Sequence, residues 1–347
     1  MLAIGPLSLD LAAIWFLLVG VLLVGYAILD GFDLGVGSLH LLVARTDDER
    51  RTLMTSIGPV WDGNEVWLLT AGGALFAAFP LVYATVFSGF YIALMLVLFA
   101  LIFRAVALEF RGQLASAGWR RAWDVAFFLG SLLPALLFGV ALGNIARGLP
   151  LDASGSYTGG LLGLLDPFTL LVGLTGLAML VMQGSIWLVV KTEGRVHARA
   201  RIAAFSALTV FGVLWVVTTV ASRAAAPHLW DAYGAGAAWL VPAVFLVALL
   251  AVPVLLRLGR AGLAFVASSV AIGALFGILG IGLYPTIVPS TGAGTPLTLD
   301  NASSSDLTLG AMLVIALIGM PLVLAYTAFV YHRFRGKTRL DEAGHAY

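Results

Sequence analysis

The sequence predicts an all-α, polytopic integral membrane protein with about nine transmembrane helices, its N-terminus outside and its C-terminus in the cytoplasm. Of the 347 residues, 61% are hydrophobic and only 11% are charged, whereas soluble domains carry about 25% charged residues. Charge-free runs recur along the whole chain, and a bilayer core takes about 20 helical residues. The basic residues gather in alternate loops, which also favours this class.

The spans follow from the charge-free runs and from the prolines that interrupt them. The run at 66–103 has 38 residues, about 57 Å as one helix, and Phe79-Pro80 divides it because proline breaks helices. The run at 261–299 becomes rich in Pro and Gly after Leu283, so it holds one span and then a loop. We expect a single transmembrane domain over 1–347, with spans at about 11–40, 62–79, 82–108, 124–146, 167–190, 202–222, 236–256, 262–284 and 307–331.

The basic residues predict the orientation of these spans. The chain has 19 Lys and Arg residues. With nine spans, all of them, including Arg339 in the C-terminal tail, fall on one side of the membrane, except Arg104, Arg147 and Arg223. Because cytoplasmic loops are enriched in Lys and Arg, that side is predicted to be the cytoplasm. An acidic Asp10 and no basic residue precede the first span. A cleavable signal peptide is therefore not expected, and the first span should remain in the mature protein.

Composition also narrows the chemistry. The chain has no cysteine, which excludes disulfides, iron–sulfur clusters and thiolate metal sites. The net charge of +1 gives no indication of nucleic-acid binding. None of the five histidines lies in the middle of a predicted span, where a haem in a helical bundle takes its axial ligands. Three mid-span methionines are interpreted as packing. We therefore expect no haem and no transition metal bound by this chain; the methionines are Met95, Met179 and Met182.

Ionisable residues within the predicted spans are the main functional candidates. Such groups are costly in a membrane and commonly mark ion or proton pathways. In the predicted orientation they fall in one layer on the cytoplasmic half of four consecutive helices. The members of this layer are Asp30, Asp33, Asp62, Glu65, Arg104, Glu109 and Asp124.

Spacing adds detail to this layer. Asp30 and Asp33 are three residues apart, as are Asp62 and Glu65, so each pair shares one helix face. Two carboxylates that close together favour sharing a proton. Arg104 is the one cation deep enough in the predicted spans to pair with them.

Other interpretations of the same residues stay open at this stage. Asp62 follows Pro59 near a helix start, where aspartate commonly serves as an N-cap. Asp30, Asp33 and Arg104 can equally form a static salt bridge between helices. Glu109 and Asp124 lie near the membrane surface and can simply be solvated. Interfacial tryptophans are usually membrane anchors, and this interpretation applies to Trp61, Trp67, Trp119 and Trp123.

Three sequence blocks resemble a known family. They are "LDGFDLGVG" at the end of the first span, "GPVWDGNEVWLLTAGGALFAAFP", and "FRAVALEFRG". Together with the C-terminal "LYPTIVPS" and "LTLDNASSSDLTLG", they are similar to subunit II of the cytochrome bd-type quinol oxidases. The resemblance runs from end to end in the same order, and the "WDGNEVW" block is its most specific part.

The resemblance implies a function for the complex and a role for this chain. The complex oxidises quinol and reduces dioxygen to water with protons from the cytoplasm. Haems b and d belong to subunit I, and subunit II is the haemless partner that supports assembly and the proton-uptake path. The family's uptake carboxylate falls on Asp62, after Trp61. We expect the proton path to comprise Asp62, Trp61, Glu65, Asp30, Asp33, Arg104 and Glu109.

Partners and location follow from the same resemblance. The chain is expected in the bacterial cytoplasmic membrane, bound to subunit I. Whether small single-span accessory subunits and a structural quinone also bind stays open. Quinol and dioxygen are then substrates of the complex, and membrane lipid surrounds it. The alternative function is a proton-coupled secondary transporter. Transporters of that class place ionisable groups near the midplane and contain inverted repeats, whereas here the charges lie to one side and no repeat is evident.

Overall fold

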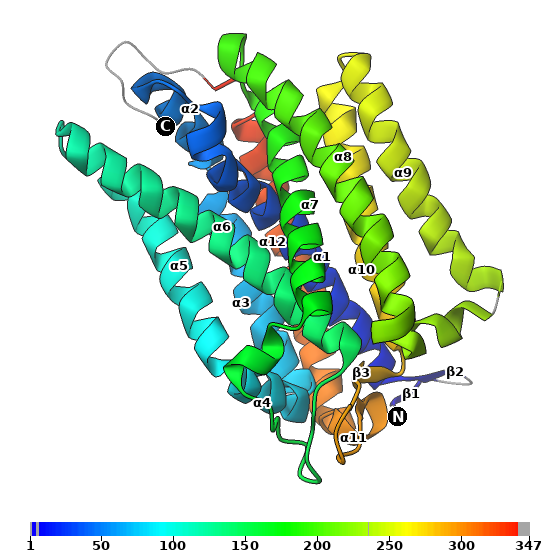
Figure 1. Ribbon diagram of the computed structural model, residues 1–347. Coiled ribbons are helices and arrows are strands. Elements are labelled where there is room, and N and C mark those ends of the chain that lie inside the picture. Colours follow the sequence, from blue (N-terminus) through cyan, green and yellow to red (C-terminus); the bar gives the residue numbers. More distant parts are fainter. Residues whose placement is uncertain (1, 5–6, 235, 339–347) are drawn as a thin grey trace.

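The chain folds into a bundle of long helices, seen in a computed structural model that describes residues 2–4, 7–234 and 236–338 (Figure 1). The extreme ends of the predicted domain and Arg339 lie outside the described residues. The main helices are α1 (Leu11–Val43), α2 (Asp47–Ile57), α3 (Trp61–Ala78), α4 (Pro80–Gly89), α5 (Tyr91–Phe110), α6 (Ala117–Arg147), α7 (Pro167–Lys191), α8 (Gly194–Ala225), α9 (Leu240–Arg257), α10 (Ala261–Leu283) and α12 (Asp306–Arg333).

Short elements occupy the loops between these helices. Two antiparallel hairpins pair β1 (Leu2–Ile4) with β2 (Leu7–Leu9), and β3 (Thr286–Val288) with β4 (Leu297–Thr298). Three short 3-10 helices and a single helical turn complete the connections. They are η1 (Leu161–Leu164), η2 (Pro227–Gly234), η3 (Gly236–Trp239) and α11 (Leu299–Ala302).

The predicted helical membrane class is confirmed. Within the described residues, 8 helices are long and apolar enough to cross a membrane. The remaining predicted span, 62–79, is occupied by α3, whose first turns carry Asp62, Asn64 and Glu65 and are therefore less apolar. The count of nine spans and their orientation stay predictions.

The helix boundaries agree with one predicted break and differ from one predicted span. The predicted break at Phe79-Pro80 separates α3 from α4, with Pro80 as the first residue of α4. The predicted span 82–108, however, is not one helix, because the chain turns again at Phe90 between α4 and α5. Gly89 permits this turn to pack against the loop that follows α6, since a Cβ there would lie 2.8 Å from the Cβ of Tyr157.

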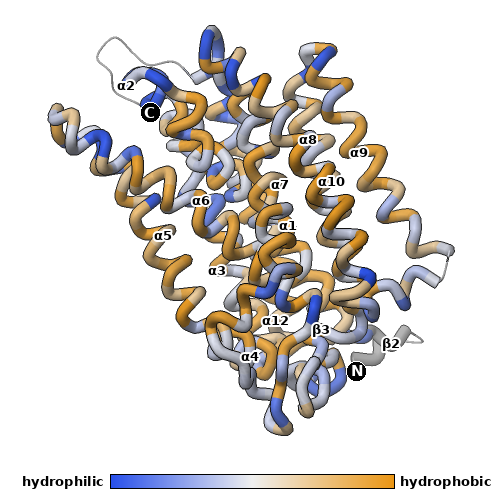
Figure 2. The backbone as a smooth tube through the Cα atoms, in the orientation of Figure 1, coloured by the Kyte–Doolittle hydropathy of each residue, from blue (hydrophilic) through white to orange (hydrophobic). Residues whose placement is uncertain are grey.

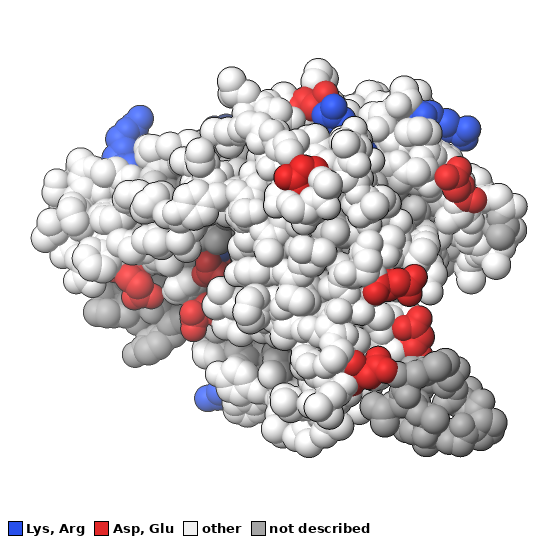
Figure 3. Space-filling view, turned by 90° about the horizontal axis from the view of Figure 1, so that it is seen from below, with Lys and Arg blue, Asp and Glu red and all other residues white. Residues whose placement is uncertain are grey.

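α2 is a helix that the sequence analysis did not predict. Thr46 and Glu49 form a capping box at its start, which satisfies two free backbone N–H groups. Its first turn is acidic and its last turn is buried, so the helix lies across one end of the bundle rather than through it. Figure 1 shows α2 at the end opposite α4 and α11. The surface at that opposite end is largely uncharged, with scattered acidic and basic residues (Figure 3).

The bundle is organised around α1. On one side α1 packs against α3 and α6, with α5 on α6, and on the other side it packs against α7 and α10, which carry α8 and α9. α12 lies behind α1 and touches α1 and α3 (Figure 1). Apolar residues dominate the middle of the long helices, and polar residues gather towards their ends (Figure 2).

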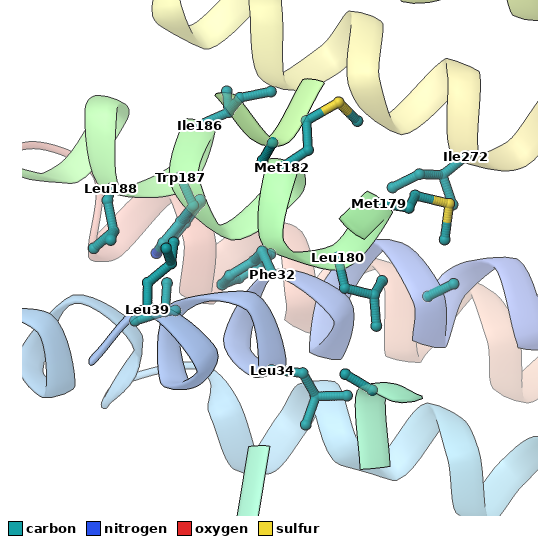
Figure 4. Packing of buried hydrophobic residues seen from close by; sticks show 14 of the residues in the cluster. Phe32, Leu34, Leu39, Met179, Leu180, Met182, Ile186, Trp187, Leu188 and Ile272 are labelled. Atoms are coloured by element: carbon teal, nitrogen blue, oxygen red, sulfur yellow. The ribbon is translucent and has the colours of Figure 1, made fainter. Parts of the chain in front are cut away.

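The seam between α1 and α7 forms the centre of the core (Figure 4). Phe32 of α1 stacks on Trp187 of α7 with ring centroids 4.1 Å apart. Leu34 and Leu39 from α1, and Met182 from α7, are buried in the same hydrophobic cluster. These contacts fix the half of α1 that carries the candidate site.

Two glycines let the backbones of α1 and α7 touch along this seam. A Cβ on Gly35 would lie 2.0 Å from the carbonyl oxygen of Leu180, and a Cβ on Gly184 would lie 2.5 Å from the carbonyl carbon of Gly35. Small residues permit such close helix packing in membranes. The glycines of "DGFDLGVG" therefore have a packing role.

Replacing Gly35 with alanine should separate α1 from α7. We expect Gly35→Ala to lower the thermal unfolding temperature of the purified protein, because overpacking costs about 1–3 kcal/mol. Gly20→Ala is the matched control on the same helix, since a Cβ at Gly20 meets nothing within 4 Å. Equal stability of the two variants would contradict this account of the seam.

Candidate functional site

Three charged side chains meet inside the helix bundle and form what we call the buried ion cluster: Asp30, Asp33 and Arg104. Arg104 of α5 donates to both carboxylate oxygens of Asp30 on α1, from Nη2 to Oδ1 at 2.5 Å and from Nη1 to Oδ2 at 3.1 Å. Its Nη2 lies 3.9 Å from Oδ2 of Asp33. All three side chains are at most 1% exposed. The predicted meeting of this pair with Arg104 is thus found in the structure.

Close helix packing places Arg104 opposite α1. Gly130 of α6 lies against α5 there, and a Cβ at this position would be 2.6 Å from the carbonyl oxygen of Ala100 and 3.0 Å from the Cβ of Arg104. α5 and α6 therefore approach each other at the level of the cluster. The three-residue spacing of Asp30 and Asp33 then turns both carboxylates towards the guanidinium group.

Asp33 is the carboxylate of the cluster with an open acceptor oxygen. Its Oδ2 accepts a hydrogen bond from Nδ2 of Asn64 at 2.8 Å. Its Oδ1 is buried and has no hydrogen-bond partner among the described residues. Two carboxylates face one guanidinium, so the fully ionised cluster would carry a net negative charge, which is costly away from water. A proton on Asp33 would remove that charge.

Two predicted path residues, Asp62 and Glu65, lie at the start of α3. Asp62 is exposed and Glu65 is half-buried. Glu65 lies within electrostatic range of Asp62 on one side and of Arg104 and Asp30 on the other. Glu65 is thus more buried than Asp62 and lies within electrostatic range of the cluster, and Trp61 beside Asp62 is half-buried.

The structure does not support a capping role for Asp62. The N-cap of α3 is Val60, and no side chain makes a capping hydrogen bond there. Asp62 is the second residue of the helix, where a carboxylate still interacts favourably with the helix dipole. Its exposed position leaves it free to exchange protons with water.

Glu109 and Asp124 lie apart from this route. Glu109 is exposed near the end of α5, and its backbone carbonyl accepts a hydrogen bond from Gln113. Asp124 is fully buried, so the interpretation of Asp124 as a solvated residue is wrong. The predicted layer on the cytoplasmic half stays a prediction, and its members fall into two clusters, because Asp124 belongs to a second one.

We call this second group the surface ion cluster: His40, Asp47, Arg50, Arg111, Arg120 and Asp124. Asp124 accepts hydrogen bonds from Nε2 of His40 at 2.6 Å, Nε of Arg111 at 2.6 Å and Nη1 of Arg50 at 3.0 Å. Asp47 accepts from Arg111 at 2.6 Å and Arg120 at 2.9 Å. The cluster joins the ends of α1 and α5 to α2 and α6.

Glu49 extends this connection to α8. It forms an ion pair with Arg199 and accepts a hydrogen bond from the backbone N–H of Arg45 at 2.7 Å. Burial alone would raise the pKa of Glu49, but these hydrogen bonds outweigh it and hold the pKa below its ordinary value. Glu49 is therefore ionised at neutral pH, and α2 is tied to both halves of the bundle.

Three residues that contact the cluster or its neighbours were missed by the sequence analysis. Asn64 bonds Asp33, and Tyr331 of α12 donates to Oδ1 of Asn64 at 2.9 Å. The buried hydroxyl of Tyr26 lies near Asp30 and has no hydrogen-bond partner among the described residues. The four-residue spacing of Tyr26 and Asp30 could have indicated their proximity, whereas Tyr331 is 267 residues from its partner.

Three of the residues that could ligate a metal or haem are engaged in other contacts. His40 is bonded to Asp124, and Met179 and Met182 are packed in the apolar core (Figure 4). Across the described ranges, no group of three or more His, Cys, Asp or Glu side chains is arranged to hold a metal ion.

Comparisons with known proteins give a consistent result. Residues 11–334 match the family described as cytochrome bd terminal oxidase subunit II. The chain is 39% identical to cytochrome bd-I ubiquinol oxidase subunit 2 of Escherichia coli K12, covering 95% of both chains. It is 35% identical to cytochrome bd ubiquinol oxidase subunit 2 of Bacillus subtilis, covering 95% of this chain and 97% of that one.

A solved structure shares the fold. A chain of the bd oxidase from Geobacillus thermodenitrificans superimposes with a TM-score of 0.76, covering 94% of this chain and 99% of that chain. Its sequence identity is 18%, so this likeness concerns the fold alone.

Removing the carboxylate at the centre of the surface ion cluster should destabilise the protein. Asp124→Asn leaves His40 and Arg50 without their charged acceptor and leaves Arg111 with Asp47 alone, and breaking a buried pair costs about 3–5 kcal/mol. We expect a lower thermal unfolding temperature for the purified protein. Asp231→Asn, which changes an exposed carboxylate in η2, is the control. A shift of equal size in both variants would contradict the anchoring role.

Proposed function

This chain belongs to the cytochrome bd terminal oxidase subunit II family, and from that premise we propose that it is the haem-free subunit of a quinol-oxidising, oxygen-reducing complex. In this proposal it holds subunit I and carries cytoplasmic protons towards the site of oxygen reduction. The observation that carries the proposal is the buried ion cluster with its connection to the exposed Asp62. The family assignment leaves the transporter alternative without support.

The proton path begins at Asp62. Under the predicted orientation this residue faces the cytoplasm, and its exposed carboxylate can collect protons from water. Glu65 is the next titratable group inwards, because it interacts electrostatically with both Asp62 and the buried ion cluster. Asp33 then offers its open oxygen, Oδ1, as the acceptor inside the bundle.

Arg104 sets the charge balance at the end of this path. Its two hydrogen bonds to Asp30 neutralise that carboxylate, while its distance of 3.9 Å from Asp33 is too long for a hydrogen bond. Asp30 and Arg104 thus form a fixed ion pair, and Asp33 is the member able to change its protonation. The static salt bridge and the proton carrier are then neighbouring parts of one cluster.

The haem-free role rests on the family assignment and on the engaged histidine and methionine side chains described above. Haems b and d are then held by subunit I, which supplies the redox chemistry. This chain's own residues bind and pass protons and hold the helices that position them.

We place the contact with subunit I on the face formed by α3, α5 and α12. In α12, Leu309 is the only described residue that is fully buried, and large apolar side chains such as Ile315 and Leu322 are about 70% exposed. α12 also packs beside α3, which carries Asp62 and Glu65. A partner on this face would bring the path close to the haem-bearing subunit and would cover this apolar surface.

The replacement Asp62→Asn tests the proton-uptake role. In the complex purified with subunit I and with full haem content, we expect oxygen reduction to slow at least several-fold, because an amide cannot carry the proton. The control is Asp48→Asn, which alters an exposed carboxylate on the neighbouring helix α2 and should turn over at the wild-type rate.

Two outcomes count against this role. Unchanged turnover of Asp62→Asn with intact haem would exclude Asp62 from the uptake path. Loss of haem in the same variant would show that the residue serves assembly instead.

A further inference from the structure

Asn64 bridges the buried ion cluster and α12. Its Nδ2 donates to Oδ2 of Asp33 at 2.8 Å and to the carbonyl oxygen of Leu29 at 3.3 Å. Its Oδ1 accepts the hydroxyl hydrogen of Tyr331 at 2.9 Å. Asn64 itself is 1% exposed, so these three contacts account for its buried amide group.

The surrounding groups determine which way the amide points. The carbonyl oxygen of Leu29 can only accept a hydrogen bond, so it favours the –NH₂ group on the side of α1. Tyr331 donates to the amide oxygen on the other side. A flipped amide would place its oxygen against the Leu29 carbonyl and against the Asp33 carboxylate, and both contacts are repulsive when Asp33 is ionised.

We propose that Asn64 and Tyr331 are positioning residues that keep Asp33 ready to accept and release a proton during oxygen reduction. This inference rests on the proposed function, in which Asp33 carries protons. A hydrogen bond donated to a carboxylate favours its ionised form. The hydroxyl of Tyr331 polarises the amide and strengthens the bond that Asn64 donates, because hydrogen bonds in a chain reinforce one another.

The charges around Asp33 explain why this bond is needed. Asp33 is fully buried beside a second carboxylate, Asp30, on the same helix, Glu65 of α3 lies within electrostatic range, and the nearby cation is Arg104 of α5. Arg104, however, is engaged by Asp30 and lies 3.9 Å from Asp33. Asn64 is therefore the only hydrogen-bond donor to Asp33 among the described residues, and α12 contributes the uncharged hydroxyl of Tyr331.

One oxygen of Asp33 keeps the carboxyl group in position, and the other exchanges the proton. Asn64 occupies Oδ2, and Oδ1 stays open. A proton arriving along the path binds Oδ1 to give the neutral acid, and its departure restores the carboxylate. Asn64 and Tyr331 exchange no proton in this step. They keep the carboxyl group in one orientation through both states.

The test follows the protonation of Asp33 in the oxidase assembled with subunit I. The infrared C=O stretch of a protonated carboxyl group is recorded against pH and is assigned to Asp33 by its loss in Asp33→Asn. We expect the midpoint to move to higher pH by about one unit in Asn64→Leu, because the donor is lost. Tyr331→Phe should move it in the same direction by about half a unit.

A tyrosine in η2, on a different part of the bundle, provides the control. The hydroxyl of Tyr233 donates to the carbonyl oxygen of Ile278 at 2.7 Å, so Tyr233→Phe removes a similar bond far from Asp33 and should leave the midpoint unchanged. Tyr331→Phe keeps the aromatic ring that packs against Trp187. If Asn64→Leu fails to assemble, Tyr331→Phe decides the question alone.

The outcomes distinguish this inference from the proposed function. An unchanged midpoint in Tyr331→Phe, with the Asp33 band present, would overturn the positioning role and leave proton carriage by Asp33 intact. Wild-type turnover in Asp33→Asn, with no band assigned to Asp33, would overturn the role of Asp33 in the path and the positioning inference with it.

Discussion

The bidentate pair between Arg104 and Asp30 is the interaction on which the site depends. Both groups are almost completely buried, and a buried charge is tolerated only when it is paired and hydrogen-bonded. Because Arg104 satisfies Asp30 through both carboxylate oxygens, it cannot fully neutralise Asp33 as well. Two carboxylates share one cation unequally. Asp33 is therefore the carboxylate that a proton, rather than Arg104, neutralises.

The helix packing maintains this arrangement. Glycine contacts bring α1 against α7 and α6 against α5, which sets the positions of the two carboxylates and the arginine relative to one another. At the end of the bundle, the surface ion cluster ties α1, α2, α5 and α6 together. The site is therefore built on rigid helices, while Asp62 remains at the surface, where protons are available.

The sequence predicts much of this structure because its strongest signals are local. Charge-free runs and Pro80 place most helices, and the three-residue spacing of Asp30 and Asp33 predicts their common face. The break at Phe90 lies within an apolar run, where Ser88-Gly89 is the only local signal, and the turn packs against the distant Tyr157. Asn64, Tyr331 and the burial of Asp124 depend on contacts between distant segments, which spacing cannot reveal. The family resemblance indicated the polar layer but not its division into two clusters.

Replacing Glu65 tests most directly whether protons pass from Asp62 to the buried ion cluster, because Glu65 lies within electrostatic range of both. Single-turnover proton uptake should be measured with a pH indicator in the assembled oxidase as the reduced complex reacts with oxygen. We expect slower proton uptake in Glu65→Gln at unchanged haem content. Glu193→Gln, which alters an exposed carboxylate before α8, should take up protons at the wild-type rate. Uptake at the wild-type rate in Glu65→Gln would contradict the account.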